Sequence, residues 1–395
     1  MRRKNVYLMY AIALLQGMVF YGAIATLYRQ ARGISVFQIT LIEGISLLLC
    51  IAFEVPWGIL ADRIGYKAAL VLCNGLYCIS KLVFWHASGF WWFLLERVLL
   101  SIAIAGLSGV DTSLLYLSCR PGDSQRVFGI YDSMGLIGLV IASVGYSVWI
   151  REQYTLAAAL TAAAYGIAAL LTLFLSEVRE KAPRSFQLAE YTQLLHRLLR
   201  DSNRLLFLAA VACLTQTHQT ITVFLNQLQY TRCGLPSAWF GYLYIAVALC
   251  GTCSVFSTVW SKKWGDRRGG TLLLGAAVIA CGVLAMTRSA ALSVASLILL
   301  RAANSLFQPF QLEWQNRMVQ SANRATELSL CAMLVDGASA GISVLLGAVA
   351  DFRLWAAFLC GGVLCLVGLG LFRLWYRRIS SVCGQAQPST DSVTQ

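Results

Sequence analysis

The sequence has few charged residues. Asp, Glu, Lys and Arg make up 12% of its 395 residues, whereas soluble domains carry about 25%. Apolar residues make up 58%, and the mean hydropathy is positive. This composition excludes an ordinary soluble domain and indicates a protein built for a lipid bilayer.

Motifs of catalysis and of energy use are also missing. The chain has only three histidines, no HExxH sequence and no Walker loop, which argues against a zinc protease and against ATP hydrolysis. Cys250 and Cys253 form the only CxxC pair among 13 cysteines. This pair lies in an apolar stretch without a nearby His, so we expect packing rather than metal or redox chemistry. We therefore expect no enzyme activity, no cofactor and no metal.

Long apolar runs dominate what is present. A membrane-spanning helix needs about 20 mainly apolar residues, and barrel strands have only about ten. The runs are therefore too long for a barrel, and they predict an all-α integral membrane fold with twelve transmembrane helices. The first run is too long for a cleaved signal peptide. The predicted spans are 6–28, 36–60, 68–87, 89–117, 127–149, 155–176, 205–229, 238–261, 270–287, 289–316, 327–350 and 354–377.

Basic residues are divided unevenly between the loops of the two sides. Of the 31 Lys and Arg residues, 22 fall on the side of both termini, six, including Arg29, on the other, and three, Lys81, Arg97 and Arg301, inside spans. The positive-inside rule then places both termini in the cytoplasm, in a multi-pass protein of the cytoplasmic membrane. The same bias explains the net charge of +13 without a nucleic-acid partner.

A short polar stretch separates the second and third spans. It reads Gly-Ile-Leu-Ala-Asp-Arg-Ile-Gly-Tyr-Lys over residues 58–67. This resembles the loop signature of the major facilitator superfamily. The residues that carry the resemblance are Gly58, Asp62, Arg63, Gly65 and Lys67.

The resemblance implies a cytoplasmic gate. In the family the loop acid lies against the N-terminus of the eleventh helix, which here would begin near residues 325–327, and locks the two halves together. Asp111 and Asp132 are expected at a similar depth, where a carboxylate interacts favourably with a helix dipole. The alternative is that Arg63 and Lys67 only anchor the loop at the membrane surface.

The two halves of the sequence repeat with an offset near 200 residues. Gly33 pairs with Gly234, Gly65 with Gly265, Arg97 with Arg301, and Arg126 with Arg324. The repeat predicts two six-helix bundles, 1–176 and 204–379, with a substrate site between them near the bilayer midplane. Residues 177–203 are predicted to form a cytoplasmic linker with an amphipathic helix, and 380–395 a disordered tail.

Charged residues inside the spans are costly and need a reason to be there. Glu54 and Glu43 share one helix face, and a carboxylate buried there can take up a proton, so both are proton-coupling candidates. The alternatives are a structural carboxylate and a carboxylate that contacts the substrate. Arg97 and Arg301 are expected to face each other across a cavity, or to form structural ion pairs.

Polar residues form stripes on the seventh and tenth spans. Such stripes either line a site or join helices, and we favour lining. His218 is expected to be a hydrogen-bonded structural residue. The substrate-cavity candidates, besides Arg97 and Arg301, are Gln219, Thr222, Asn226, Asn304 and Gln308.

Arg97 matches an arginine in the fourth-helix signature of drug-efflux members of the family. This resemblance to bacterial efflux members implies secondary active transport by alternating access. The leading expectation is proton-coupled export of a small solute by a monomer whose other partners are protons and the lipid bilayer. The alternatives are uptake of a sugar or an organic anion, and a membrane receptor or scaffold that keeps the fold without transport.

Overall fold

The computed structural model describes residues 2–119, 123–178, 188–318 and 324–385. Over these ranges the chain forms helices and no strands. Eleven segments are long and apolar enough to span a membrane. One of them, Ser237–Met286, has 50 residues and bends at Gly265, so it covers two of the predicted spans. The predicted all-α membrane fold is confirmed.

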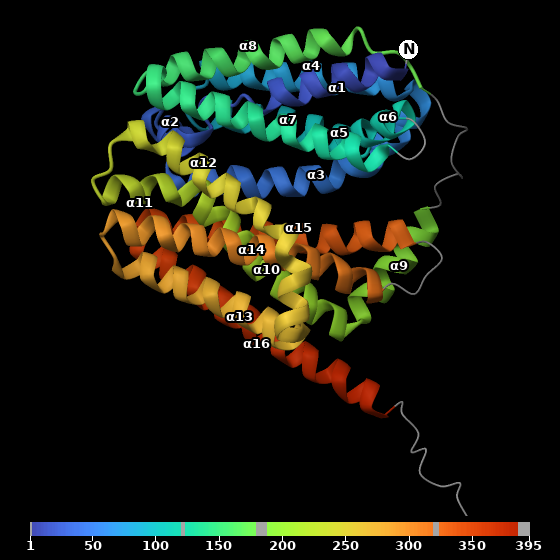
Figure 1. Ribbon diagram of the computed structural model, residues 1–395, viewed down its shortest axis with the longest axis vertical. Coiled ribbons are helices and arrows are strands. Elements are labelled where there is room, and N and C mark those ends of the chain that lie inside the picture. Colours follow the sequence, from blue (N-terminus) through green and yellow to red (C-terminus); the bar gives the residue numbers. More distant parts are fainter. Residues whose placement is uncertain (1, 120–122, 179–187, 319–323, 386–395) are drawn as a thin grey trace, which may run out of the picture.

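The chain forms two helical bundles, which lie one above the other in Figure 1. The upper bundle contains α1 (Arg2–Gly17), η1 (Gly22–Ile24), α2 (Ala25–Ala31), α3 (Val36–Ile64), α4 (Tyr66–His86), α5 (Phe90–Leu107), α6 (Val110–Ser118), α7 (Ser124–Gly145), η2 (Tyr146–Ile150) and α8 (Tyr154–Thr172). Helix α9 (Leu188–Arg200) follows it.

The lower bundle begins at α10. It contains α10 (Ser202–Gln219), η3 (Thr220–Leu225), α11 (Asn226–Arg232), η4 (Ser237–Trp239), α12 (Phe240–Cys250), η5 (Gly251–Phe256), α13 (Ser257–Met286), α14 (Ala290–Met318), α15 (Arg324–Phe352) and α16 (Leu354–Gln385). We call the end of the molecule that holds the N-terminus, α6 and α9 the terminal end, and the end that holds α2 and α11 the distal end (Figure 1).

The repeated glycines have matching backbone conformations. Gly33 and Gly234 have φ of 88° and 74°, and Gly65 and Gly265 have 92° and 69°. These positive values favour glycine, which has no Cβ. After both Gly33 and Gly234, the next residue donates its N–H to the carbonyl five residues back, at 3.4 Å and 3.0 Å. The sequence repeat is therefore also a repeat of helix ends and turns.

Helices α1 and α7 pack backbone to backbone through glycines. A Cβ on Gly17 would lie 2.1 Å from the carbonyl oxygen of Gly135, and one on Gly138 would lie 2.1 Å from that of Leu14. Small residues allow this close approach between membrane helices. The first span then loses its helical course directly after Gly17.

Helices α3 and α15 join the two bundles along their length and run antiparallel. Near the distal end, a Cβ on Gly347 would collide with the side chain of Thr40. Towards the terminal end, the Ser329 hydroxyl donates to the Glu54 carboxylate at 3.1 Å. This helix pair holds the two bundles together. The other helices of each bundle contact the opposite bundle mainly at the distal end.

Candidate functional site

The first and seventh spans are both irregular at matching points. Between α1 and α2 the chain passes through an irregular turn and η1, and between α10 and α11 it forms the π-helical segment η3. The two irregular segments lie about 200 residues apart, as the repeat requires. Discontinuous helices and π-segments in membrane carriers often mark binding sites. These two segments therefore point to a binding site at the centre of the interface.

The two bundles make close contacts at the distal end. The backbone N–H groups of Thr26 and Leu27 both donate to Oε1 of Gln227, at 2.9 Å and 3.2 Å. A Cβ on Gly241 would lie 2.3 Å from the carbonyl oxygen of Ser143. A carboxylate oxygen of Asp351 accepts the N–H of Val36, the first residue of α3, at 2.8 Å. These contacts close the distal end.

A buried cluster of charges lies inside the first bundle. Glu96 on α5 is 1% exposed, and its carboxylate lies 3.9 Å from the guanidinium of Arg29 and 4.0 Å from Nζ of Lys81. Lys81 donates to the hydroxyl of Tyr21 at 3.0 Å. Two cations therefore share one carboxylate beside the break in the first span.

The prediction that Arg29 lies in a loop is wrong. Helix α2 continues to Ala31, so Arg29 is still on the helix and points inward, with only 8% of the residue exposed. The guanidinium also lies 5.4 Å from the ring centroid of Phe84. Arg29 comes directly after the predicted first span, 6–28, so a span end placed a few residues later would have put it on the helix.

Arg97 forms an ion pair with Glu43, which joins α5 to α3. Its side chain is 18% exposed, and that of Glu43 is 12% exposed. One turn further along the same helices, the hydroxyls of Ser46 and Ser101 are 2.7 Å apart. Arg97 is therefore neutralised within its own bundle.

Arg301, the counterpart of Arg97, has a different environment. Nη1 of Arg301 lies 3.5 Å from Nε2 of His218, and Nε is buried without a hydrogen-bond partner. A Cβ on Gly251 would lie 2.6 Å from Nη2, so the guanidinium packs directly against the η5 backbone. Among the described residues, no carboxylate forms an ion pair with Arg301.

Tyr244 on α12 connects this arginine to the first bundle. It interacts electrostatically with both Arg301 and Tyr21. A Cβ on Gly22 would meet the Tyr244 ring at 3.4 Å, which places the ring against the break in the first span. The break in the first span, Arg301 and, through Tyr21, the charged cluster of the first bundle thus meet around Tyr244.

The predicted polar stripes divide between exposed and buried residues. Gln219 and Gln308 are exposed, whereas Thr222, Asn226 and Asn304 are buried. The Thr222 hydroxyl lies 3.2 Å from Nε2 of His218 and donates to the carbonyl of His218 at 2.9 Å. The Asn226 side chain accepts the N–H of the next residue. Thr222 thus helps to position the ring that faces Arg301.

Glu54 lies at the contact between the two bundles. Besides its hydrogen bond from Ser329, it interacts electrostatically with Asp336 on α15. Asp336 is seven residues, or two helical turns, beyond Ser329. Two carboxylates from different bundles thus lie near one another on the α3–α15 pair.

The predicted gate residues lie around the terminal ends of α3 and α4. The surroundings of Gly58 and the side chain of Asp62 lie outside what the structure describes. Arg63 is exposed. The backbone N–H groups of Tyr66 and Lys67 both donate to the carboxylate of Glu177, at 3.1 Å each.

The other two acids assigned to the gate differ in exposure. Asp111 accepts the Tyr131 hydroxyl at 3.3 Å and the N–H of Thr112 at 2.6 Å, whereas Asp132 is exposed. The eleventh helix begins at Arg324, close to its expected start. An ion pair joins Arg204 of α10 to Glu327 of α15. The sequence did not predict this pair, because its two residues are 123 positions apart and no local pattern connects them.

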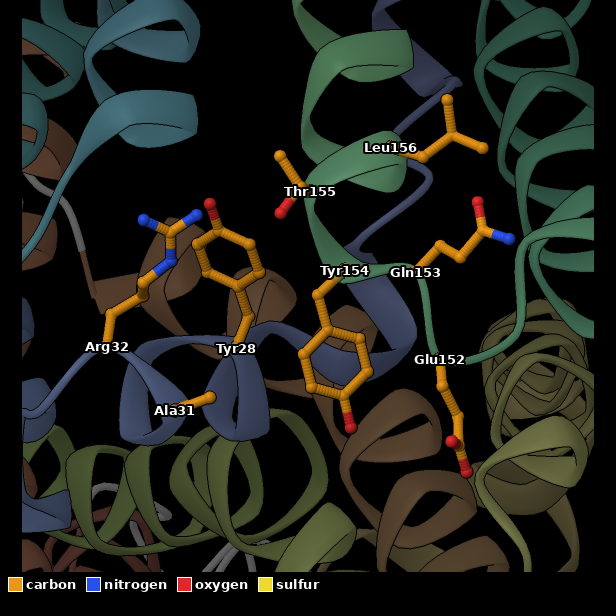
Figure 2. Close-up of a pocket in the computed structure, with 8 residues that line it drawn as sticks. All are labelled: Tyr28, Ala31, Arg32, Glu152, Gln153, Tyr154, Thr155 and Leu156. Carbon is orange, nitrogen blue, oxygen red and sulfur yellow. The ribbon is translucent and has the colours of Figure 1, made fainter.

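A separate pocket of about 510 Å³ opens near the distal end. In Figure 2, Arg32 lies beside the ring of Tyr28 on one side, and Glu152 lies beyond Tyr154 on the other. The remaining lining residues are Ala31, Gln153, Thr155 and Leu156. This pocket belongs to the first bundle alone and is distinct from the site around Tyr244.

The fold is shared with solved membrane transporters. The nucleoside transporter NupG aligns with a TM-score of 0.81 and 17% identity, covering 94% of this chain and 99% of that one. A bacterial homolog of the human lysosomal transporter Spinster, in an inward-facing and unoccupied conformation, aligns with a TM-score of 0.73 and 15% identity, covering 96% and 98%.

A mutant of the peptide transporter POT aligns with a TM-score of 0.74 and 15% identity, covering 96% of this chain and 95% of that one. No curated protein matches the sequence. The sequence does match the family model of the Major Facilitator Superfamily over residues 6–326, most of its length. The chain therefore belongs to the Major Facilitator Superfamily of membrane transporters.

Proposed function

We propose that the protein is a secondary active transporter that exports a small solute across the cytoplasmic membrane in exchange for protons. The observation that carries this proposal is the uneven contact between the bundles. Away from α3 and α15, the described hydrogen bonds between bundles lie at the distal end, where Gln227 binds Thr26 and Leu27. Alternating access requires two bundles that close at one end at a time.

Orientation follows from charge. The terminal end carries the basic excess of the sequence, so the positive-inside rule makes it the cytoplasmic end. The contacts at the distal end then favour an inward-facing form, which accepts its solute from the cytoplasm. Export starts from this form, and the opposite form must bind the solute more weakly for release.

Proton coupling is assigned to Glu54, with Asp336 as its neighbour. Two carboxylates near one another in a poorly solvated interface repel, and a proton on one of them removes that repulsion. Rocking of the bundles changes the contact between α3 and α15, so the repulsion between the two carboxylates depends on which end is closed. Glu43 is neutralised by Arg97 and is the weaker candidate.

Proteoliposomes that contain a pH-sensitive dye test this proposal. A panel of cationic, anionic and sugar solutes is added to the parent and to Glu54→Gln. We expect a solute-dependent pH change in the parent that is lost in Glu54→Gln. The matched control is Glu313→Gln, since the Glu313 side chain is 58% exposed and pairs within its own helix.

Solute movement without any proton movement would refute the coupling and leave a uniporter. A pH change that persists in Glu54→Gln would move the coupling to Asp336 or Glu43. Accumulation inside cells that express the parent, compared with cells that lack it, would reverse the assigned direction.

A further inference from the structure

We infer that the transported solute carries an anionic group, a carboxylate or a phosphate, that binds between Arg301 and Tyr244. This inference rests on the proposed transport function and names its substrate class. It follows from the charges that the protein leaves uncompensated at the centre of the interface, and from the geometry around them.

Arg301 lies near the middle of the membrane. It is eleven residues into α14, which begins at Ala290 near the distal end, and at 1.5 Å per residue this is about 16 Å along a core about 30 Å thick. A charge at this depth is unfavourable unless it is paired or reaches water. The position therefore calls for an explanation.

Among its described residues, the second bundle supplies no acid for this arginine. Glu43, the ion-pair partner of Arg97 on the second span, has no counterpart, because the eighth span from Phe240 to Ser261 contains neither Asp nor Glu. The residue before Arg301 is Leu300, where the first bundle has Glu96. Asp336, which lies near Glu54, forms no described ion pair with Arg301.

The donors of Arg301 are also largely unused. A guanidinium has five N–H donors arranged to bind carboxylate or phosphate through two bonds. The acceptor described for Arg301 is Nε2 of His218, 3.5 Å from Nη1, and Nε is buried without a hydrogen-bond partner. The residue itself remains partly exposed, so a solute in the interface can reach it.

The surroundings fit an anion and disfavour a cation. Across the interface, Arg29 and Lys81 share the single carboxylate of Glu96, which leaves that cluster with one excess positive charge. Lys81 donates to Tyr21, and Tyr21 interacts with Tyr244. Both bundles therefore present positive potential to the place where Tyr244 meets the first span.

Thermal unfolding of the purified protein with matched pairs of solutes tests the inference. Each pair differs by one anionic group: glucose and glucuronate, benzamide and benzoate, uridine and uridine monophosphate. The pairs are compared at equal concentration and equal ionic strength. We expect at least one anionic member to raise the melting temperature by a few degrees while its neutral partner has no effect.

The arginine is then changed. The shift should be lost in Arg301→Gln and be smaller in Arg301→Lys, which keeps the charge without the two-pronged donor geometry. The matched control, Arg353→Gln, removes an exposed arginine at the distal end and should retain the full shift. The melting temperature of each variant without solute shows that it is folded.

Three results would overturn the inference: no anionic member shifts the melting temperature, neutral members shift it equally, or the shift is unchanged in Arg301→Gln. Transport of both members of each pair in proteoliposomes separates this failure from that of the proposed function. Movement of only the neutral members refutes the anion site and keeps the transporter. An Arg301-dependent shift without movement of any solute keeps the site and refutes the transport.

Discussion

The two bundles carry an arginine at equivalent points of their fourth helices, and the two side chains meet different surroundings. Arg97 is paired with Glu43 in its own bundle, whereas no described carboxylate pairs with Arg301. Glu96 stands before Arg97 in the sequence and Leu300 before Arg301. Repetition of the fold has thus preserved a cation and not its counter-ion.

This difference in surroundings indicates that the arginine of the fourth helix is structural in the first bundle and available to a ligand in the second. A buried ion pair satisfies both of its members and holds two helices together, and removing one member leaves an uncompensated charge. A buried cation without a protein counter-ion depends on neutral polar groups, on water or on a ligand for its stability. The following changes test whether the two bundles differ in this way.

The largest effect is expected for Glu96→Gln. This change leaves Arg29 and Lys81 buried side by side without a carboxylate, which costs about 3–5 kcal/mol of stability. A strongly lowered melting temperature in detergent is the readout. The control is Glu152→Gln, because Glu152 is exposed at the distal end. Equal melting of the two variants would show that Glu96 is not the shared counter-ion.

A smaller loss is expected for Arg97→Gln. Glu43 is then left without its cation, but both side chains are partly exposed, so water offsets some of the loss and about 3 kcal/mol remains. The double variant Arg97→Gln/Glu43→Gln should recover most of the lost melting temperature, because neither charge remains. A double variant less stable than the single one would contradict a simple ion pair.

The smallest effect on stability is expected for Arg301→Gln. Since no described carboxylate is left unpaired, the stability in the absence of solute should stay within about 1 kcal/mol of the parent. The melting temperature, measured beside that of Arg97→Gln, gives the comparison directly. A loss as large as that of Arg97→Gln would assign Arg301 a structural role and remove the contrast between the bundles.

The partners of the two arginines do not follow from the sequence. Their offset identifies Arg97 and Arg301 as a related pair, and the sequence allows either an ion pair or a cavity position for each. The expectation that they face each other across a cavity requires that neither forms an ion pair within its own bundle. The structure pairs Arg97 with Glu43, a residue 54 positions away. No local spacing in the sequence predicts such a pair.

The sequence by itself determined the membrane class, the all-helical fold, the family and the internal repeat. Apolar runs of about 20 residues leave only helices that satisfy their own backbone in lipid. Gly33, Gly65 and their counterparts mark turns that need positive φ, so these turns too were specified locally. Properties that depend on composition, on the period of a pattern or on the conformation of single backbone positions can be predicted from the sequence.

Tertiary structure alone decided which charges meet. It turned Arg29 inward onto Glu96, brought Glu54 to Ser329 across the bundles, and left Arg301 beside His218 and Tyr244. These contacts join helices far apart in the sequence, and their energies depend on burial and on distances of a few ångströms. A charge in a membrane span reveals that a partner is needed, and only the packing of the helices reveals whether the protein supplies it.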